Sequence, residues 1–277
     1  TGFPGLIRDV RDFGLPYRDM TDLIRRITPS EKERISDPEA ALDGRPLRLS
    51  SVRVCSPIPH PEQDIICLGV NYAAHADESA QFDRKAFLLD RKKATYFSKR
   101  AYQTSGPDDL IPSYPELVTS LDYEAELAVI IGRDCKNVCE RDAAACIFGY
   151  TVLNDVSARN LQTEHNQWYF GKSLDGFTPM GPCIVTEDEI PYPPALSISS
   201  TVNGELRQNS NTKYLLHSIS EIIAELSQGM TLLAGTIIAT GTPAGVGMGF
   251  DPPKFLKSGD VVTCEIEKIG RLTNMVK

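Results

Sequence analysis

The sequence predicts a β-rich α+β protein in which a larger catalytic domain follows a small N-terminal domain. Three observations lead to this fold class. Side chains alternate with the two-residue period of a strand from Tyr123 onward. Glycine and proline are frequent, with 20 and 19 copies among 277 residues, as expected for a chain with many turns. Segments with the 3.6-residue period of a helix are few.

A proline-rich segment marks the expected boundary between residues 1–60 and residues 61–277. Three prolines occur in the six residues 56–61, where they favour an extended backbone and exclude a helix. Before this segment, isoleucines stand among charged residues, which is typical of one or two exposed helices. The N-terminal region carries no pattern of reactive side chains.

The catalytic domain opens with strand patterns. Apolar residues over 64–70 predict a buried strand, and the alternation over 123–131 predicts a second strand that ends at Gly132. Asn203-Gly204 accepts the positive φ angles of a two-residue turn and predicts a hairpin. Three further strands are expected at 147–153, 236–240 and 261–266.

Capping residues predict two helices in the same domain. Ser218 and Glu221 have the spacing of a capping box, and the helix that they begin is expected to run to about Gln228. The polar stretch 154–157 is rich in residues that cap helices, which predicts a short helix through Glu164.

The charge and the apolar pattern exclude two classes of partner. The net charge of −8 makes nucleic acid or an anionic membrane surface an unexpected partner. No apolar stretch approaches the roughly 20 residues that a membrane-spanning helix needs. Seven cysteines without a Cys-x-x-Cys pair, and no charged-then-apolar leader, are typical of reduced thiols in a soluble cytoplasmic protein.

Two glutamates are the first candidates for chemistry. Glu124 and Glu126 lie two residues apart on the predicted strand, so their side chains leave the same face about 7 Å apart at the backbone. Two carboxylates on one face suit a hard divalent cation. The alternative is a solvated strand face, but the strand is otherwise apolar, and buried charges need a partner.

Asp155 ends the next strand and precedes two polar residues of the predicted helix. Arg159 and Gln162 follow at spacings of four and three residues, so all three side chains can share one helical face. A carboxylate, a guanidinium and an amide together suit an anionic ligand beside a metal. The alternative is that Asp155 only caps the helix.

His75 and Glu78 form a possible acid–base pair. They are three residues apart, so the carboxylate can orient the imidazole if this segment is helical. The alternative is a histidine that only packs or lies on the surface. Lys172 stands in a polar turn bounded by glycines, and a glycine-rich loop follows the strand at 236–240. Neither segment has the motif of a phosphate loop, a dinucleotide site or a nucleophile elbow.

Six ordered motifs resemble the fumarylacetoacetate hydrolase family from about Asp64 to the C-terminus. They are G-V-N-Y-A-A-H at 69–75, D-Y-E-A-E-L-A-V-I-I-G at 122–132, N-D-V-S-A-R at 154–159, G-K-S-L-D-G-F-T-P-M-G-P at 171–182, V-N-G-E-L-R-Q at 202–208 and A-T-G-T-P-A-G-V-G at 239–247.

The resemblance implies a mixed β-roll or sandwich domain, a homodimer, and Mg²⁺ or Mn²⁺ bound by Glu124, Glu126 and Asp155. It further implies that His75, helped by Glu78, activates water. The resemblance also implies a catalytic role for Lys172. The residues that it implies for substrate binding are Arg159, Gln162, Thr240, Gly241 and Thr242. Fumarylacetoacetate hydrolase itself has a further aspartate ligand before the histidine, where this chain has Gly69 and Asn71, so three carboxylates and water are expected.

The predicted activity is metal-dependent hydrolysis of a C–C bond in an acylpyruvate or similar 1,3-dicarbonyl 2-oxo acid through an enolate. Because members of the family also reprotonate such enolates or form them by loss of CO₂, the alternative is a tautomerase, isomerase or decarboxylase of oxaloacetate or of a 2-hydroxymuconate type of acid. A non-catalytic binding protein is the remote alternative. In each enzymatic case, Arg159 and Lys172 are expected to face an anionic substrate.

Overall fold

The structure is a computed structural model that describes residues 5–42, 44–87 and 91–277. It divides into two compact units, Thr1–Val54 and Cys55–Lys277. In the described ranges, none of the helices has the length and apolar character that crossing a bilayer requires.

The N-terminal unit is built from short elements. Strands β1 (Leu6–Ile7) and β2 (Leu47–Arg48) pair with each other in an antiparallel ladder. Helix α2 has no buried residue and begins with a capping box between Thr28 and Glu31, so it is one of the exposed helices that the sequence predicts. The unit's helices are η1 (Val10–Phe13), α1 (Met20–Arg26), α2 (Pro29–Ser36), η2 (Pro38–Ala40) and η3 (Leu49–Ser51).

A six-stranded mixed sheet forms the centre of the second unit as far as the chain is described, in the order β10-β8-β7-β13-β3-β4. Strands β13 and β3 are parallel and the other neighbours are antiparallel. Every residue of β7 and β8 is buried, so the alternation read from the sequence does not mark a solvated face. The strands are β10 (Met180–Thr186), β8 (Ile147–Asn154), β7 (Ala125–Ile131), β13 (Ile237–Ala239), β3 (Ile65–Gly69) and β4 (Thr95–Lys99).

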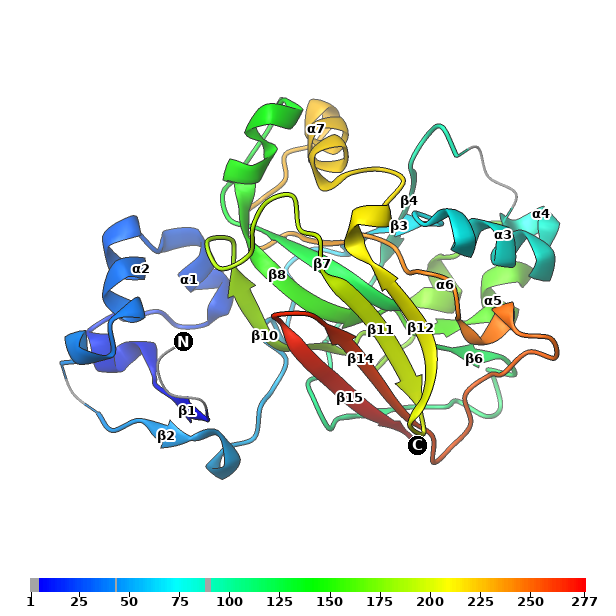
Figure 1. Ribbon diagram of the computed structural model, residues 1–277, viewed down its shortest axis with the longest axis horizontal. Coiled ribbons are helices and arrows are strands. Elements are labelled where there is room, and N and C mark those ends of the chain that lie inside the picture. Colours follow the sequence, from blue (N-terminus) through cyan, green and yellow to red (C-terminus); the bar gives the residue numbers. More distant parts are fainter. Residues whose placement is uncertain (1–4, 43, 88–90) are drawn as a thin grey trace. The chain divides into compact units, whose positions relative to one another are not determined.

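A second sheet, five-stranded within the described residues, packs on the first through β11, β14 and β15 (Figure 1). The predicted hairpin joins β11 to β12, with Asn203 at φ 53° and Gly204 at φ 81°. Apolar side chains of both sheets share one core. The strands are β12 (Glu205–Asn211), β11 (Ser197–Val202), β14 (Val261–Ile266), β15 (Gly270–Val276) and β5 (Leu110–Ile111).

Helix α7 (Ile219–Gly229) carries the predicted capping box between Ser218 and Glu221 and packs against η4 (Glu140–Cys146). Helices α3 (Ala73–Phe82), α4 (Arg84–Phe87), α5 (Arg159–Glu164) and α6 (Tyr169–Lys172) gather beside β3 and β4 (Figure 1). The last short helix is η6 (Gly247–Gly249), and η5 (Thr212–Tyr214) follows β12. The β-rich α+β class is confirmed.

One helix start was predicted wrongly. Asp155 caps no helix, because the chain continues into β9 (Ser157–Ala158), which pairs with β6 (Leu121–Asp122). Helix α5 begins only at Arg159, and its N-cap residue Ala158 has no side chain that could cap it. Asp155 therefore does not share a helical face with Arg159 and Gln162, and its carboxylate is free for another role.

Candidate active site

Three buried carboxylates meet where β7 and β8 lie side by side. Glu124 precedes β7, Glu126 lies within it, and Asp155 follows β8 directly, where its backbone NH donates to the Glu124 carbonyl at 2.9 Å. One oxygen from each residue lies within 4.8 Å of the others. Strand pairing thus brings together the three metal ligands that the sequence predicts.

Three buried cations surround these carboxylates. Lys172 Nζ lies 2.7 Å from both Glu124 Oε2 and Asp155 Oδ2. Arg159 Nη2 lies 2.7 Å from Glu124 Oε1, and Lys99 Nζ lies 2.8 Å from Asp155 Oδ1. Lys99 also donates to the carbonyls of Val156 and Lys172. Arg159 and Lys172 were expected to present their charges to a substrate; both line the pocket described below, and each is also paired with carboxylates of the cluster.

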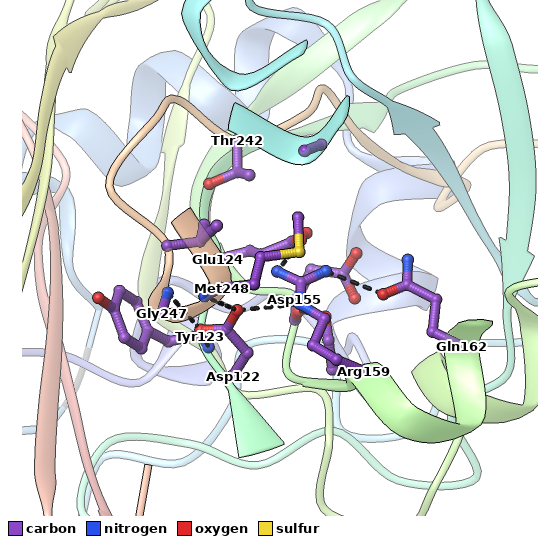
Figure 2. A network of polar contacts seen from close by, with 12 residues as sticks. Asp122, Tyr123, Glu124, Asp155, Arg159, Gln162, Thr242, Gly247 and Met248 are labelled. Atoms are coloured by element: carbon purple, nitrogen blue, oxygen red, sulfur yellow. Dashed lines mark hydrogen bonds and ion pairs between the residues drawn. The ribbon is translucent and has the colours of Figure 1, made fainter. Parts of the chain in front are cut away.

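Asp122 is a fourth carboxylate of the cluster and fixes Arg159 from the opposite side. Its Oδ2 accepts from Arg159 Nε at 2.9 Å, while Arg159 Nη1 donates to Gln162 Oε1 at 2.9 Å (Figure 2). The backbone NH groups of Gly247 and Met248 also donate to Asp122, at 2.6 and 3.1 Å. A Cβ on Gly247 would stand 2.6 Å from Asp122 Oδ1, so this close approach requires glycine.

The charged side chains of this cluster do not balance one another. Four carboxylates (Asp122, Glu124, Glu126 and Asp155) face three cations (Lys99, Arg159 and Lys172), which leaves one negative charge.

Glu126 is the carboxylate that lacks a cation. Within the described residues it forms no ion pair, and it accepts a hydrogen bond from the backbone NH of Gly241 at 2.7 Å. Burial, together with the charges of Asp155 and Glu124, raises the pKa of Glu126 well above its usual 4.5.

Glu124 behaves in the opposite way. Burial opposes its ionisation, but the charges of Lys172 and Arg159 prevail and lower the pKa of Glu124 to about 2. An oxygen-liganded divalent cation fits this donor set, because it would compensate Glu126 and change the net charge of the cluster from −1 to +1.

His75 lies on α3, so the predicted turn of helix is present. Its Nδ1 is buried and has no hydrogen-bond partner among the described residues, and its Nε2 lies 3.4 Å from Ser79 Oγ. Glu78 Oε1 stands 3.9 Å from Nδ1, beyond hydrogen-bond length. Glu78 instead accepts from the backbone NH groups of Gly245 and Val246, the shortest of these bonds being 2.9 Å.

The loop after β13, residues 240–249, therefore contacts three carboxylates through its backbone. Gly241 donates to Glu126, Gly245 and Val246 donate to Glu78, and Gly247 and Met248 donate to Asp122. The loop itself is tied to β7, since the hydroxyls of Thr240 and Thr242 donate to the carbonyls of Leu127 and Ala125 at 2.9 Å.

A pocket opens over the cluster. Of the predicted threonine–glycine–threonine group, only Thr242 lines it, because Thr240 faces β7 and Gly241 supports Glu126. Glu78 and Asp155 lie behind the lining residues. The lining residues are Leu68, Gly69, Val70, His75, Phe87, Phe97, Glu124, Glu126, Arg159, Gln162, Trp168, Lys172 and Thr242.

Two residues of the cluster were not among the predicted site residues. Asp122 is the first residue of the motif at 122–132, but only Glu124 and Glu126 of that motif were predicted to be site residues. Lys99 ends β4, whose pattern Thr-Tyr-Phe-Ser-Lys was not interpreted as a strand; had it been, strand alternation would have placed Lys99 on the same face as Phe97, which lines the pocket.

Comparison with known proteins identifies the family. A family model described as fumarylacetoacetate (FAA) hydrolase C-terminal matches residues 64–277. The chain belongs to the fumarylacetoacetate hydrolase family. The resemblance read from the motifs is confirmed, and the chain is an enzyme of this family.

Among the relatives of this fumarylacetoacetate hydrolase family enzyme, oxaloacetate tautomerase YisK of Bacillus subtilis (strain 168) is 46% identical over 228 residues, covering 82% of this chain and 74% of the relative. The mitochondrial oxaloacetate tautomerase fahd2 of Xenopus laevis is 41% identical over 269 residues, covering 96% of this chain and 80% of the relative.

Two solved structures share the fold of this family enzyme. A fumarylacetoacetate hydrolase from Exiguobacterium antarcticum is 39% identical with a TM-score of 0.81, covering 99% of this chain and 93% of that chain. A 5-carboxymethyl-2-hydroxymuconate delta-isomerase from Mycobacterium smegmatis is 38% identical with a TM-score of 0.69, covering 84% of this chain and 85% of that chain.

Proposed function

We propose that this enzyme is a divalent-cation-dependent tautomerase of 2-oxo acids that interconverts the enol and keto forms of oxaloacetate. The observation that carries the proposal is one pocket lined by Glu124, Glu126 and His75, beside the acidic cluster that Asp155 completes, in which His75 Nδ1 has no hydrogen-bond partner among the described residues. The names of the two oxaloacetate tautomerases support the reaction type, and the named isomerase structure supports the same class.

The carboxylates of Glu124, Glu126 and Asp155 would hold Mg²⁺ or Mn²⁺. When bound, the cation supplies Lewis-acid stabilisation of the negative charge that an enolate carries on its oxygen.

The protein's own groups then serve binding and proton transfer. Gln162 Oε1 already accepts from Arg159, so its amide NH₂ is the group that can donate to a substrate carboxylate. Lys172 lines the pocket and adds a positive charge beside the developing enolate. The aromatic rings of Phe97 and Trp168 form part of the wall and restrict the access of water.

His75 is the group proposed to move the proton. Ketonisation removes one proton from the enol hydroxyl and adds one proton at C3, so the reaction needs no other reactant. The Nδ1 atom of His75 forms no hydrogen bond within the described structure, with Glu78 Oε1 3.9 Å away, which leaves it able to accept or donate that proton.

The test follows the ketonisation of enol-oxaloacetate by ultraviolet absorbance, with Mg²⁺ or Mn²⁺ and then with chelator. We expect catalysis with the cation and loss of catalysis in chelator, with activity returning when the cation is restored. A rate equal to the uncatalysed rate under all of these conditions would contradict the proposal.

Hydrolysis of an acylpyruvate is the second candidate, favoured by the 39% identical fumarylacetoacetate hydrolase structure, which covers 99% of this chain. In that reaction His75 would activate a water that attacks a carbonyl carbon. Coupling pyruvate release to lactate dehydrogenase measures it directly. A kcat/KM for cleavage above that for ketonisation would make hydrolysis the main activity, and CO₂ release from oxaloacetate would indicate a decarboxylase.

A further inference from the structure

A second pocket adjoins the active-site pocket and has a different chemical character. It shares Gly69, Val70 and Phe87 with the pocket over the carboxylate cluster. The two pockets therefore adjoin each other at the end of β3. A substrate whose reactive end lies over the carboxylates can extend into this second compartment.

The wall of the second compartment is held in place by hydrogen bonds. Asn71 receives the backbone NH of His217 on Oδ1 at 2.8 Å and donates from Nδ2 to the His217 carbonyl at 3.2 Å. The Asn71 carbonyl accepts from the Leu216 NH at 2.9 Å. Leu216 and His217 line the compartment, so one asparagine fixes this side of it against the end of β3.

The small side chains of Ala76 and Ala80 on α3 also line the compartment. His75 lies on the same helix and lines the active-site pocket. Helix α3 thus contributes His75 to the active-site pocket and Ala76 and Ala80 to the second compartment. A substrate tail in the second compartment would therefore contact the same helix that carries the proposed base.

The compartment is basic. Among the residues that the structure describes, its lining contains Arg91, Lys93 and His217 and no carboxylate. Arg91 is neutralised by Asp77, which it contacts at 2.6 Å. Lys93, in contrast, makes no ion pair in the part of the chain that the structure describes, so its ammonium is the charge available to a ligand.

We propose that this compartment, defined by Lys93 and His217, binds the second carboxylate of a 2-oxo dicarboxylic acid and selects such acids over 2-oxo acids with an uncharged tail. The inference rests on the proposed function, because the 2-oxo acid end must lie over the carboxylate cluster. Lys93 supplies the charge for the second carboxylate, and His217 supplies a further polar contact.

Binding tests the inference without requiring turnover. 2-Oxoglutarate and 2-oxopentanoate have the same chain length and differ in the terminal carboxylate. Calorimetry in saturating Mg²⁺ is expected to show tighter binding of 2-oxoglutarate, and Lys93→Ala is expected to weaken it by about 3- to 10-fold while changing 2-oxopentanoate by less than about twofold. Equal binding of the two acids, or detectable binding of neither, would overturn the inference.

Kinetics provide the second readout. For ketonisation of enol-oxaloacetate we expect Lys93→Glu to raise KM by about tenfold or more with little change in kcat, and the same variant to spare the 4-methyl ester of oxaloacetate. Lys92→Glu is the matched control, since it reverses the neighbouring positive charge at a residue outside the lining. A Lys93→Glu effect equal for acid and ester, or equal to that of the control, would reject the subsite.

The two proposals fail in different ways. If the wild-type enzyme does not accelerate ketonisation but binds 2-oxoglutarate in preference to 2-oxopentanoate in a Lys93-dependent manner, the tautomerase proposal fails and the subsite stands. If ketonisation is fast but does not distinguish acid from ester, the subsite fails alone.

Discussion

Single residues in this site differ mainly in how their charge is compensated. Arg159 is held by Asp122, Glu124 and Gln162, and Lys172 bridges two carboxylates. Groups held in this way keep their geometry when a substrate arrives, so the cost of arranging them is met during folding. Glu126 differs from them because its compensation has to come from outside the protein chain.

Glu126→Gln is expected to stabilise the cation-free protein and to abolish its stabilisation by Mg²⁺. The raised pKa means that, above the unfolded-state value of about 4.5, the native state holds a proton that the unfolded state releases. The free energy of unfolding of the cation-free wild type therefore contains a contribution that falls as pH rises from about 4.5. Thermal unfolding across pH 5 to 8, with and without Mg²⁺, measures this, and the fall is expected to disappear in Glu126→Gln.

The pH dependence of the free energy of unfolding has the opposite sign for Glu124. Its pKa of about 2 makes its ion pairs a stabilising contribution that is lost only in strong acid.

For the Glu126 prediction, Glu126→Asp keeps the charge and is the control. A Gln variant with a wild-type pH profile would show that Glu126 is compensated in another way.

His75→Asn is expected to lower the ketonisation rate by ~10² or more while leaving the affinity for Mg²⁺ nearly intact, because Nδ1 contacts none of the three carboxylates by hydrogen bond. Calorimetric titration with Mg²⁺ and steady-state kinetics on the same preparation separate these effects. Loss of both in equal measure would point to a structural histidine. Ser79→Ala is the matched control, since Ser79 lies beside Nε2.

At the scale of elements, the loop over 240–249 depends on glycine at a position where a backbone NH meets a buried carboxylate. In Gly247→Ala the added Cβ would stand 2.6 Å from Asp122 Oδ1 and from the Lys254 carbonyl. We expect a loss of about 1–3 kcal/mol in the free energy of unfolding, measured with urea, and a lower turnover. Gly229→Ala, which meets open space, should change both much less. Equal effects of the two substitutions would argue against the steric reason.

The elements also show what the sequence alone could predict. Strand β7, the hairpin at Asn203-Gly204 and helix α7 each have a local pattern, so their existence followed from alternation, turn chemistry and a capping box. The start of α5 could not be predicted in this way. Its cap residue is Ala158, which pairs with Leu121 of β6, 37 positions away, while Ser157 pairs with Asp122.

The site residues also divide into those that have a local sequence pattern and those that only long-range contacts bring into the site. The three predicted metal ligands could be selected because two of them lie two residues apart on the predicted strand and the third follows the next strand. Lys99 contacts Asp155 from another strand, β4, so only the assembled sheet reveals this ion pair. Likewise, the role of Gly241 in supporting Glu126 is a backbone contact, which residue identity does not encode.

At the scale of the whole molecule, all residues named for the two compartments lie in the unit Cys55–Lys277. We expect a fragment with these bounds to fold and to keep its stabilisation by Mg²⁺, which thermal unfolding with increasing Mg²⁺ measures. The full chain is the control. A fragment that is folded but no longer stabilised by Mg²⁺ would show that the site depends on residues before Cys55.

Assembly is the second prediction at this scale. The family resemblance implies a homodimer, and we propose that assembly for this chain. Light scattering coupled to size-exclusion chromatography should then give about twice the chain mass of 30.5 kDa. A mass of one chain over a range of protein concentrations would contradict the proposal.

The loop that donates to Glu126, Glu78 and Asp122 has a further consequence for observing the enzyme at work. Five of its backbone NH groups donate to a carboxylate. The rate at which each of these protons exchanges with solvent deuterium therefore depends on the charge of that carboxylate. The amides of Gly241, Gly245 and Gly247 thus report on three parts of the site. They donate to Glu126 of the proposed cation site, to Glu78 beside His75, and to Asp122, which holds Arg159, respectively. Deuterium exchange resolved at these three glycines would reveal in what order a ligand engages the three parts of the site.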